Sequence, residues 1–215
     1  MKKGAIFDMD GTILDSMPTW RGFTKVIIEL LGMEQDPELE QTLGVLGVTK
    51  GADYLNEHYG MNITPEQIQE QVNDKIINLY KEEFQPKEGV LEFIEACRAH
   101  GFRMCVASAT DSPYVEMALK RLGIRDCFLE VFSCSQVGKG KDEPDIYEAA
   151  LACLGLEKEE VIVLEDSHHA AVTAKNAGFP VVGIYDVMEP RTEELKALAD
   201  YYTVDYKNLA GIFKE

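Results

Sequence analysis

Two aspartates near the start of the chain, Asp8 and Asp10, are spaced so that their side chains can act together. They follow apolar residues 5–7, which predict a short buried strand over residues 4–8. Side chains at alternate positions of an extended chain point to the same side, so both carboxylates should meet where the strand ends. Like charges this close are costly unless a cation lies between them, and oxygen ligands suit Mg²⁺. The pattern predicts a metal-assisted carboxylate site of the kind used in phosphate chemistry.

A glycine and a threonine, Gly11 and Thr12, follow the two aspartates directly. Asp and Gly are frequent turn residues, so a turn without chemistry is the simpler interpretation of this motif taken alone. The choice depends on whether other polar residues are expected at the same place in the fold.

The chain after residue 88 alternates between segments typical of buried strands and segments typical of helices. Strands are expected at 102–107, 130–133, 161–164, 181–184 and 201–204. Helices are expected at 89–100, 112–122, 146–154, 167–177 and 191–199. Alternation of this kind, with continuous apolar strands, predicts an α/β fold with a doubly wound, Rossmann-like parallel sheet covered on both faces.

The chain before residue 88 is expected to be helical after its first strand. Helical spacing occurs over residues 18–31 and 53–59, and Thr64 begins a further helix. We therefore predict an α/β catalytic core formed by residues 1–16 and 88–215. Residues 17–87 are expected to form an inserted all-helical cap domain that closes on the substrate about hinges near 15–18 and 84–88.

Polar residues also follow other predicted strands, as the site interpretation requires. Ser108, Ala109 and Thr110 end the strand at 102–107, Glu165 and Asp166 end the strand at 161–164, and Lys139 and Lys141 precede the helix near 146. The carboxyl ends of parallel strands share one edge of a sheet, where ligands bind in open α/β folds. Each cluster alone could be a helix cap or first-turn acid, but their combination at one edge favours a site.

The order of these motifs resembles the haloacid dehalogenase superfamily of phosphotransferases. D-x-D-G-T comes first, S-x-T and a lysine before P-D come next, and E-D-S comes last. The sequence is most similar to the branch that contains β-phosphoglucomutase and small-sugar phosphatases, whose helical cap follows the first motif. The resemblance covers essentially the whole chain, and its first and last motifs are the most specific.

The resemblance implies catalytic roles for four residues. Asp8 would be the nucleophile that becomes an aspartyl-phosphate. Asp10 would be the general acid for the leaving alkoxide and then the base for water, so it must carry a proton at the start. Ser108 would hydrogen-bond the transferring phosphoryl group, and Lys141 would pair with both Asp8 and that group.

The resemblance also implies binding roles. The phosphate-binding set would be Thr12, Ser108, Ala109 and Thr110. Mg²⁺ would be held by the Asp8 side chain, the Asp10 backbone carbonyl and Asp166, with Glu165 binding either directly or through water. The substrate would be a small phosphorylated metabolite, most simply a sugar phosphate.

Two departures from the family pattern stand out. The third motif usually reads K-P-x-P-D, but Asp142 replaces the first proline here, and Lys139 is a rival for the role of Lys141. The family often has a glycine two or three residues after E-D-S, whereas this sequence continues with His168, His169 and Ala170. Adjacent histidines cannot share a helix face, so we expect helix-start residues here and not a zinc pair.

Two cap residues bear on the choice between phosphatase and phosphomutase. The phosphomutases of this branch carry a histidine where Trp20 stands and a cap arginine that grips a second phosphate. Trp20 cannot move protons, and residues 43–50 contain no arginine and one cation, Lys50. We therefore expect Trp20 and Lys50 to contact the substrate of a phosphatase.

Composition restricts the partners. With 21 basic and 38 acidic residues, the formal net charge of −17 repels nucleic acid and anionic membranes. Five cysteines without a C-x-x-C pair indicate reduced thiols, and no signal peptide or spanning segment is expected, so a cytoplasmic location is predicted. The sequence does not predict an oligomeric state.

Four other interpretations remain open. A phosphomutase would use the same motifs. A dehalogenase fits poorly, because that reaction needs neither a protonated Asp10 nor Mg²⁺. A response-regulator receiver is doubly wound too, but it is shorter and has no helical cap. A non-catalytic binding protein on the same fold would not require the complete set of motif residues.

Overall fold

The computed structural model describes residues 2–207 and 209, except for the side chains of residues 44, 45 and 47–49. The chain forms two compact units. The first contains Met1–Met17 and Tyr80–Glu215, and the second contains Pro18–Leu79. Among the described residues, no helix combines the length and the apolar character needed to cross a bilayer.

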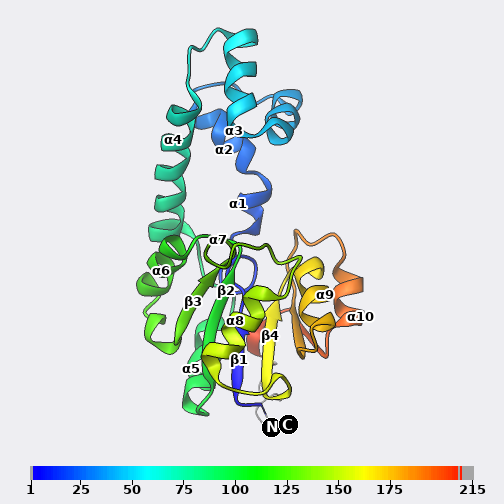
Figure 1. Ribbon diagram of the computed structural model, residues 1–215. Coiled ribbons are helices and arrows are strands. Elements are labelled where there is room, and N and C mark those ends of the chain that lie inside the picture. Colours follow the sequence, from blue (N-terminus) through cyan, green and yellow to red (C-terminus); the bar gives the residue numbers. More distant parts are fainter. Residues whose placement is uncertain (1, 208, 210–215) are drawn as a thin grey trace. The chain divides into compact units, whose positions relative to one another are not determined.

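The first unit is built on a parallel sheet (Figure 1). Its strands are β1 (Gly4–Phe7), β2 (Arg103–Ser108), β3 (Glu130–Ser133), β4 (Val161–Glu165), β5 (Val181–Ile184) and β6 (Tyr201–Thr203). They lie in the order β3-β2-β1-β4-β5-β6, and every pairing is parallel. The predicted doubly wound α/β fold is confirmed, and each strand lies within one residue or so of its predicted bounds.

Helices cover both faces of the sheet (Figure 1). They are α5 (Val90–Ala99), α6 (Ser112–Arg121), α7 (Cys134–Val137), α8 (Asp145–Leu154), α9 (His168–Asn176) and α10 (Thr192–Leu198). Successive residues of a strand face opposite sides, so Ile6 packs into the core beneath α8 and α9. Phe7 packs on the other side against Phe93 of α5 and against Phe128, with ring centroids 6.2 and 5.6 Å away. β1 is therefore fully buried between apolar layers on both faces of the sheet.

The second unit is helical and has its own apolar core. It contains α1 (Met17–Arg21), α2 (Phe23–Leu30), α3 (Pro37–Tyr59) and α4 (Pro65–Asn78), with no strand among its described residues. Its core is formed by Ile28, Leu39, Leu43, Ala52, Leu55, Ile68 and Val72. Thr64 begins α4 with the capping box that the sequence indicates.

Two helix predictions in this unit were wrong in extent. The helix expected over 18–31 is divided at Gly22 into α1 and α2. The helix expected over 53–59 begins at Pro37, where Asp36 accepts a hydrogen bond from the Glu38 amide. Glycines within α3 obscure the apolar repeat on which the sequence prediction depends.

The chain returns from the helical unit through a wide turn, η1 (Leu79–Glu83), which has π-helical bonding. The sequence assigned residues 80–87 to the cap, but they group with the sheet unit. Tyr80 and Phe84 explain this grouping, because both are buried and their rings meet edge to face at 5.1 Å. Arg121 of α6 donates hydrogen bonds to the carbonyls of Tyr80 (3.1 Å) and Phe84. The turn is thus tied to the sheet unit by α6.

Candidate active site

The end of β1 brings Asp8 to the carboxyl edge of the sheet, between β2 and β4. Phe7 is paired with Val106 and Leu164, and the amide of Asp8 donates to the Leu164 carbonyl at 3.0 Å. Lys141 donates from Nζ to Asp8 Oδ1 at 2.5 Å and to Glu165 Oε1 at 2.5 Å. Lys141 therefore lies against the predicted nucleophile. Lys139 pairs with Asp145 at 3.5 Å instead.

Burial controls the electrostatics of this pair. Burial raises the pKa of Asp8 to about 7, with Glu165 adding to the rise and Lys141 opposing it. Burial disfavours the Lys141 ammonium, but the carboxylates of Asp8 and Glu165 outweigh it and raise the pKa of Lys141 well above its ordinary value. Lys141 is therefore charged at any physiological pH, but its single positive charge does not offset the burial of the acids around it, and the pKa of Asp8 stays above its ordinary value.

A cluster of three buried carboxylates can accept a metal ion. Oxygen atoms of Asp8, Glu165 and Asp166 all lie within 4.8 Å of one another. Burial, together with the neighbouring carboxylates of Asp8 and Glu165, raises the pKa of Asp166 well above its usual value. Hard oxygen donors with uncompensated negative charge in a buried place fit a divalent cation such as Mg²⁺.

Gly11 makes room for this cluster. Its φ of +88° is left-handed, and a Cβ added there would lie 2.2 Å from Asp166 Oδ2. Thr12 is fully buried and donates from its hydroxyl to Asp166 Oδ1 at 3.3 Å. The Thr12 side chain is therefore engaged with a carboxylate of the cluster.

We expect Gly11→Ala to damage the metal cluster as well as the turn. Left-handed backbone costs alanine about 1–2 kcal/mol, and the clash with Asp166 adds to this. Gly138→Ala is the matched control, because its φ of +80° is similar and nothing lies within 4 Å of the added Cβ. Urea unfolding should show a larger loss for Gly11→Ala, and calorimetric titration should show weakened Mg²⁺ binding in that variant alone. Equal losses in both variants would mean that the contact with Asp166 is unimportant.

Asp10 is held by three hydroxyl groups. Ser16 donates to Oδ1 at 2.7 Å, Thr110 donates to Oδ2 at 2.8 Å, and Tyr80 lies 2.7 Å from both oxygens. Tyr80 and Thr110 also lie within hydrogen-bond distance of each other, at 3.1 Å. The carboxylate is thus fixed in orientation by residues from three separate segments.

Ser108 and its neighbours lie at the end of β2. Ser108 is 1% exposed, and its Oγ accepts from the Thr110 amide at 3.0 Å. Ala109 is exposed, so it can offer only its backbone. Thr110 uses its hydroxyl on Asp10. The loop therefore has one exposed backbone position, a Thr110 hydroxyl that is used on Asp10, and a Ser108 hydroxyl that accepts one bond and can still donate its own hydrogen.

Trp20 and Lys50 belong to the helical unit. Trp20 packs on Phe23 with ring centroids 5.0 Å apart, and Lys50 is exposed near the middle of α3. Residues 43–50 include five positions, 44, 45 and 47–49, whose side chains the structure does not describe. His168 and His169 begin α9 as expected, and neither belongs to the carboxylate cluster found among the described residues.

Sequence reasoning missed three residues that support the site. Tyr147 of α8 donates to Glu165 Oε1 at 2.8 Å, and Ser16 and Tyr80 bind Asp10. Ser16 follows Asp10 by only six positions in the sequence, so sequence reasoning could have included it with the first motif. Tyr147 and Tyr80 are far away in sequence and match the spacing of ordinary core residues, so only the fold brings them to the site.

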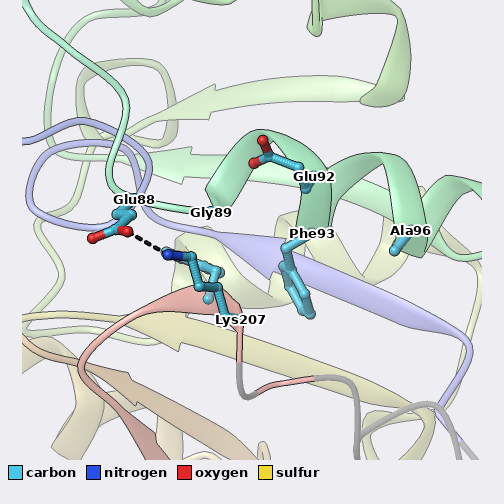
Figure 2. A pocket seen from close by; sticks show the side chains of 7 residues that line it. Glu88, Gly89, Glu92, Phe93, Ala96 and Lys207 are labelled. Atoms are coloured by element: carbon cyan, nitrogen blue, oxygen red, sulfur yellow. Dashed lines mark hydrogen bonds and ion pairs between the residues drawn. The ribbon is translucent and has the colours of Figure 1, made fainter.

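A pocket elsewhere on the sheet unit contains none of the predicted site residues (Figure 2). It has a volume of about 500 Å³ and lies between the start of α5 and the segment after β6. An ion pair between Glu88 and Lys207 lies at its edge, and Phe93 lines it.

Comparison with known proteins connects this geometry to a family. The family model for haloacid dehalogenase-like hydrolases matches residues 5–184. The phosphorylated carbohydrates phosphatase of Thermotoga maritima is 26% identical over 186 residues, which cover 86% of this chain and 85% of that protein. Hexitol phosphatase B of Escherichia coli is 28% identical over 176 residues, covering 80% and 79%. The crystal structure of a candidate β-phosphoglucomutase from Thermotoga maritima shares the fold, with a TM-score of 0.81, 24% identity and coverage of 99% and 98%.

Proposed function

Since the chain belongs to the haloacid dehalogenase-like hydrolases and is a phosphatase, we propose that it hydrolyses a small sugar phosphate through an aspartyl-phosphate on Asp8. The observation that carries the proposal is the 2.5 Å contact between Lys141 and Asp8 beside a buried carboxylate cluster. The names of the two curated relatives support a phosphorylated carbohydrate as substrate.

The reaction has two steps. An oxygen of Asp8 attacks phosphorus, the bond between phosphorus and the ester oxygen breaks, and Asp10 gives its proton to the leaving alkoxide. Asp10 then takes a proton from water, whose oxygen attacks the same phosphorus and releases inorganic phosphate from Asp8. Phosphoryl transfer depends mainly on positioning and charge, and Lys141 would hold Asp8 and neutralise the phosphoryl oxygens while Ser108 binds them.

The residues proposed to hold Mg²⁺ are Asp8, Asp166 and the Asp10 backbone carbonyl. When bound, the cation supplies positive charge that draws the anionic phosphate towards an anionic nucleophile. Glu165 already accepts bonds from Lys141 and Tyr147 on Oε1. We propose that Glu165 acts mainly by orienting Lys141 and contacts the cation through water.

We propose the helical unit as the cap that selects the substrate, with Trp20 packing on the ligand and Lys50 offering a single positive charge. The exposure of Lys50 supports this role, since an exposed ammonium can meet an anionic ligand. A cytoplasmic setting is proposed too, and the five unpaired cysteines are consistent with reducing conditions.

The proposal is tested by phosphate release from a panel of phosphorylated metabolites with Mg²⁺ present. Hexose and hexitol phosphates should be the best substrates, and an enzyme that releases no phosphate from any of them contradicts the proposal. β-Glucose 1-phosphate with a trace of its 1,6-bisphosphate separates the phosphatase from a mutase. Lysine cannot make the bidentate grip on a second phosphate that arginine makes, so mainly inorganic phosphate is expected. Predominant glucose 6-phosphate would instead assign the chain as a phosphomutase.

A further inference from the structure

We propose that Tyr80 is a positioning residue for Asp10, which with Thr110 and Ser16 keeps this carboxyl group in one place through both steps of the reaction. The inference rests on the proposed function and adds a residue that no sequence motif contains. Tyr80 is 0% exposed, and its hydroxyl lies 2.7 Å from both carboxylate oxygens of Asp10.

The chemical type of the three partners is suited to the double role of Asp10. A general acid that later acts as base must be held in its protonated form and in its ionised form. An ammonium or guanidinium can only donate and would favour the ionised form alone. A hydroxyl donates to a carboxylate and also accepts from a carboxylic acid after rotating about its C–O bond. Three hydroxyls can therefore hold Asp10 equally well before and after the proton leaves.

The bonds are arranged so that Tyr80 joins the other two donors. Ser16 contacts Oδ1 and Thr110 contacts Oδ2, whereas Tyr80 contacts both oxygens and also lies 3.1 Å from Thr110 Oγ1. Without the Tyr80 hydroxyl, the carboxyl plane would be fixed at its two ends by small side chains from different loops. The phenol thus restrains rotation of the carboxyl group.

Tyr80 is itself held rigidly. Its carbonyl accepts from Arg121 at 3.1 Å, and its ring meets Phe84 edge to face at 5.1 Å and stacks on Tyr114 at 6.0 Å. The π-helical turn Leu79–Glu83 carries the residue, and local π-helical bonding is frequent at functional sites. A side chain fixed at its backbone and on its ring can hold a partner to the tolerance that general acid catalysis needs.

A simpler explanation is that the buried phenol needs a hydrogen-bond partner and that Asp10 provides it. The two explanations differ in what happens when the hydroxyl is removed. In kcat/KM, which reports the first step, a positioning role matters only for substrates whose leaving group needs a proton. A purely structural role affects all substrates alike.

The test compares Tyr80→Phe with wild type on two esters. One is the best hexose phosphate from the screen, whose alkoxide must be protonated as it leaves. The other is p-nitrophenyl phosphate, whose phenolate leaves without a proton. The kcat/KM of Tyr80→Phe should fall by about 10–100-fold on the hexose phosphate. It should change by less than about 3-fold on p-nitrophenyl phosphate, because this constant reports only the first step.

Tyr114→Phe is the matched control. Its ring stacks on Tyr80, and no described contact joins its hydroxyl to Asp10, so both substrates should react within about 2-fold of wild type. Asp10→Asn should show the same substrate dependence as Tyr80→Phe with a larger loss on the hexose phosphate. Thermal unfolding of each variant shows that the protein is folded.

Equal losses on both esters, or no loss on either, would overturn the role of Tyr80 while leaving the proposed function intact. A wild-type enzyme that hydrolyses neither ester would overturn the proposed function, and the positioning role would fall with it. The two failures are therefore distinguishable from the wild-type measurement alone.

Discussion

Asp8→Asn should lower phosphatase turnover by at least about a thousandfold. The amide nitrogen and oxygen cannot attack phosphorus, so no covalent intermediate can form. The fold should be retained, because asparagine has nearly the same shape as aspartate. Burial raises the pKa of Asp8 to about 7, so an ionised carboxylate is disfavoured at this position and a neutral amide is tolerated. A brief incubation with substrate radiolabelled in its phosphate should label the wild-type protein transiently and the variant not at all.

The control for this variant is Asp142→Asn, which removes a negative charge beside Lys141 at an exposed position. It should keep turnover within about 3-fold of wild type. Mass spectrometry excludes deamidation of the introduced asparagine. Residual activity above about a thousandth of wild type in protein free of deamidation would remove Asp8 from the role of nucleophile.

Removal of Mg²⁺ should abolish activity, and its return should restore it. The buried oxygens of Asp8, Glu165 and Asp166 lie within 4.8 Å of one another, and no attack on an anionic phosphate is expected while their charge is uncompensated. Excess chelator should leave less than about a thousandth of turnover. Ca²⁺ should substitute poorly, because it prefers longer bonds and higher coordination.

A second readout of the metal site does not depend on activity. A cation that binds only the folded protein stabilises it by about 2.7 kcal/mol at a hundred times its dissociation constant, so Mg²⁺ should raise the melting temperature. Asp166→Asn should lose most of this shift, and Asp142→Asn should keep it. Full turnover in excess chelator, or an equal Mg²⁺ shift in Asp166→Asn, would contradict the assigned site.

The sheet and its polar edge could be predicted from sequence because they depend on local signals. The apolar strands that lead to Asp8, Ser108 and Glu165 can each be located from local sequence, and parallel pairing brings their ends together. The long helix α3 was predicted only in its last third, because its glycines interrupt the apolar repeat. The tyrosines that bind Asp10 and Glu165, Tyr80 and Tyr147, could not be predicted, since a tyrosine at helical spacing has the pattern of an ordinary core residue.

The central position of β1 has a consequence for how the chain folds as it is synthesised. β1 is made before either of its neighbours, which are residues 103–108 on one side and 161–165 on the other. The helical unit emerges in between and has its own core, so it can fold while both edges of β1 are still unpaired. Pairings this distant in sequence form slowly, and an exposed apolar strand is prone to aggregate. The strand that leads into Asp8 is thus synthesised before both of its partner strands and is completed only after the second of them has emerged.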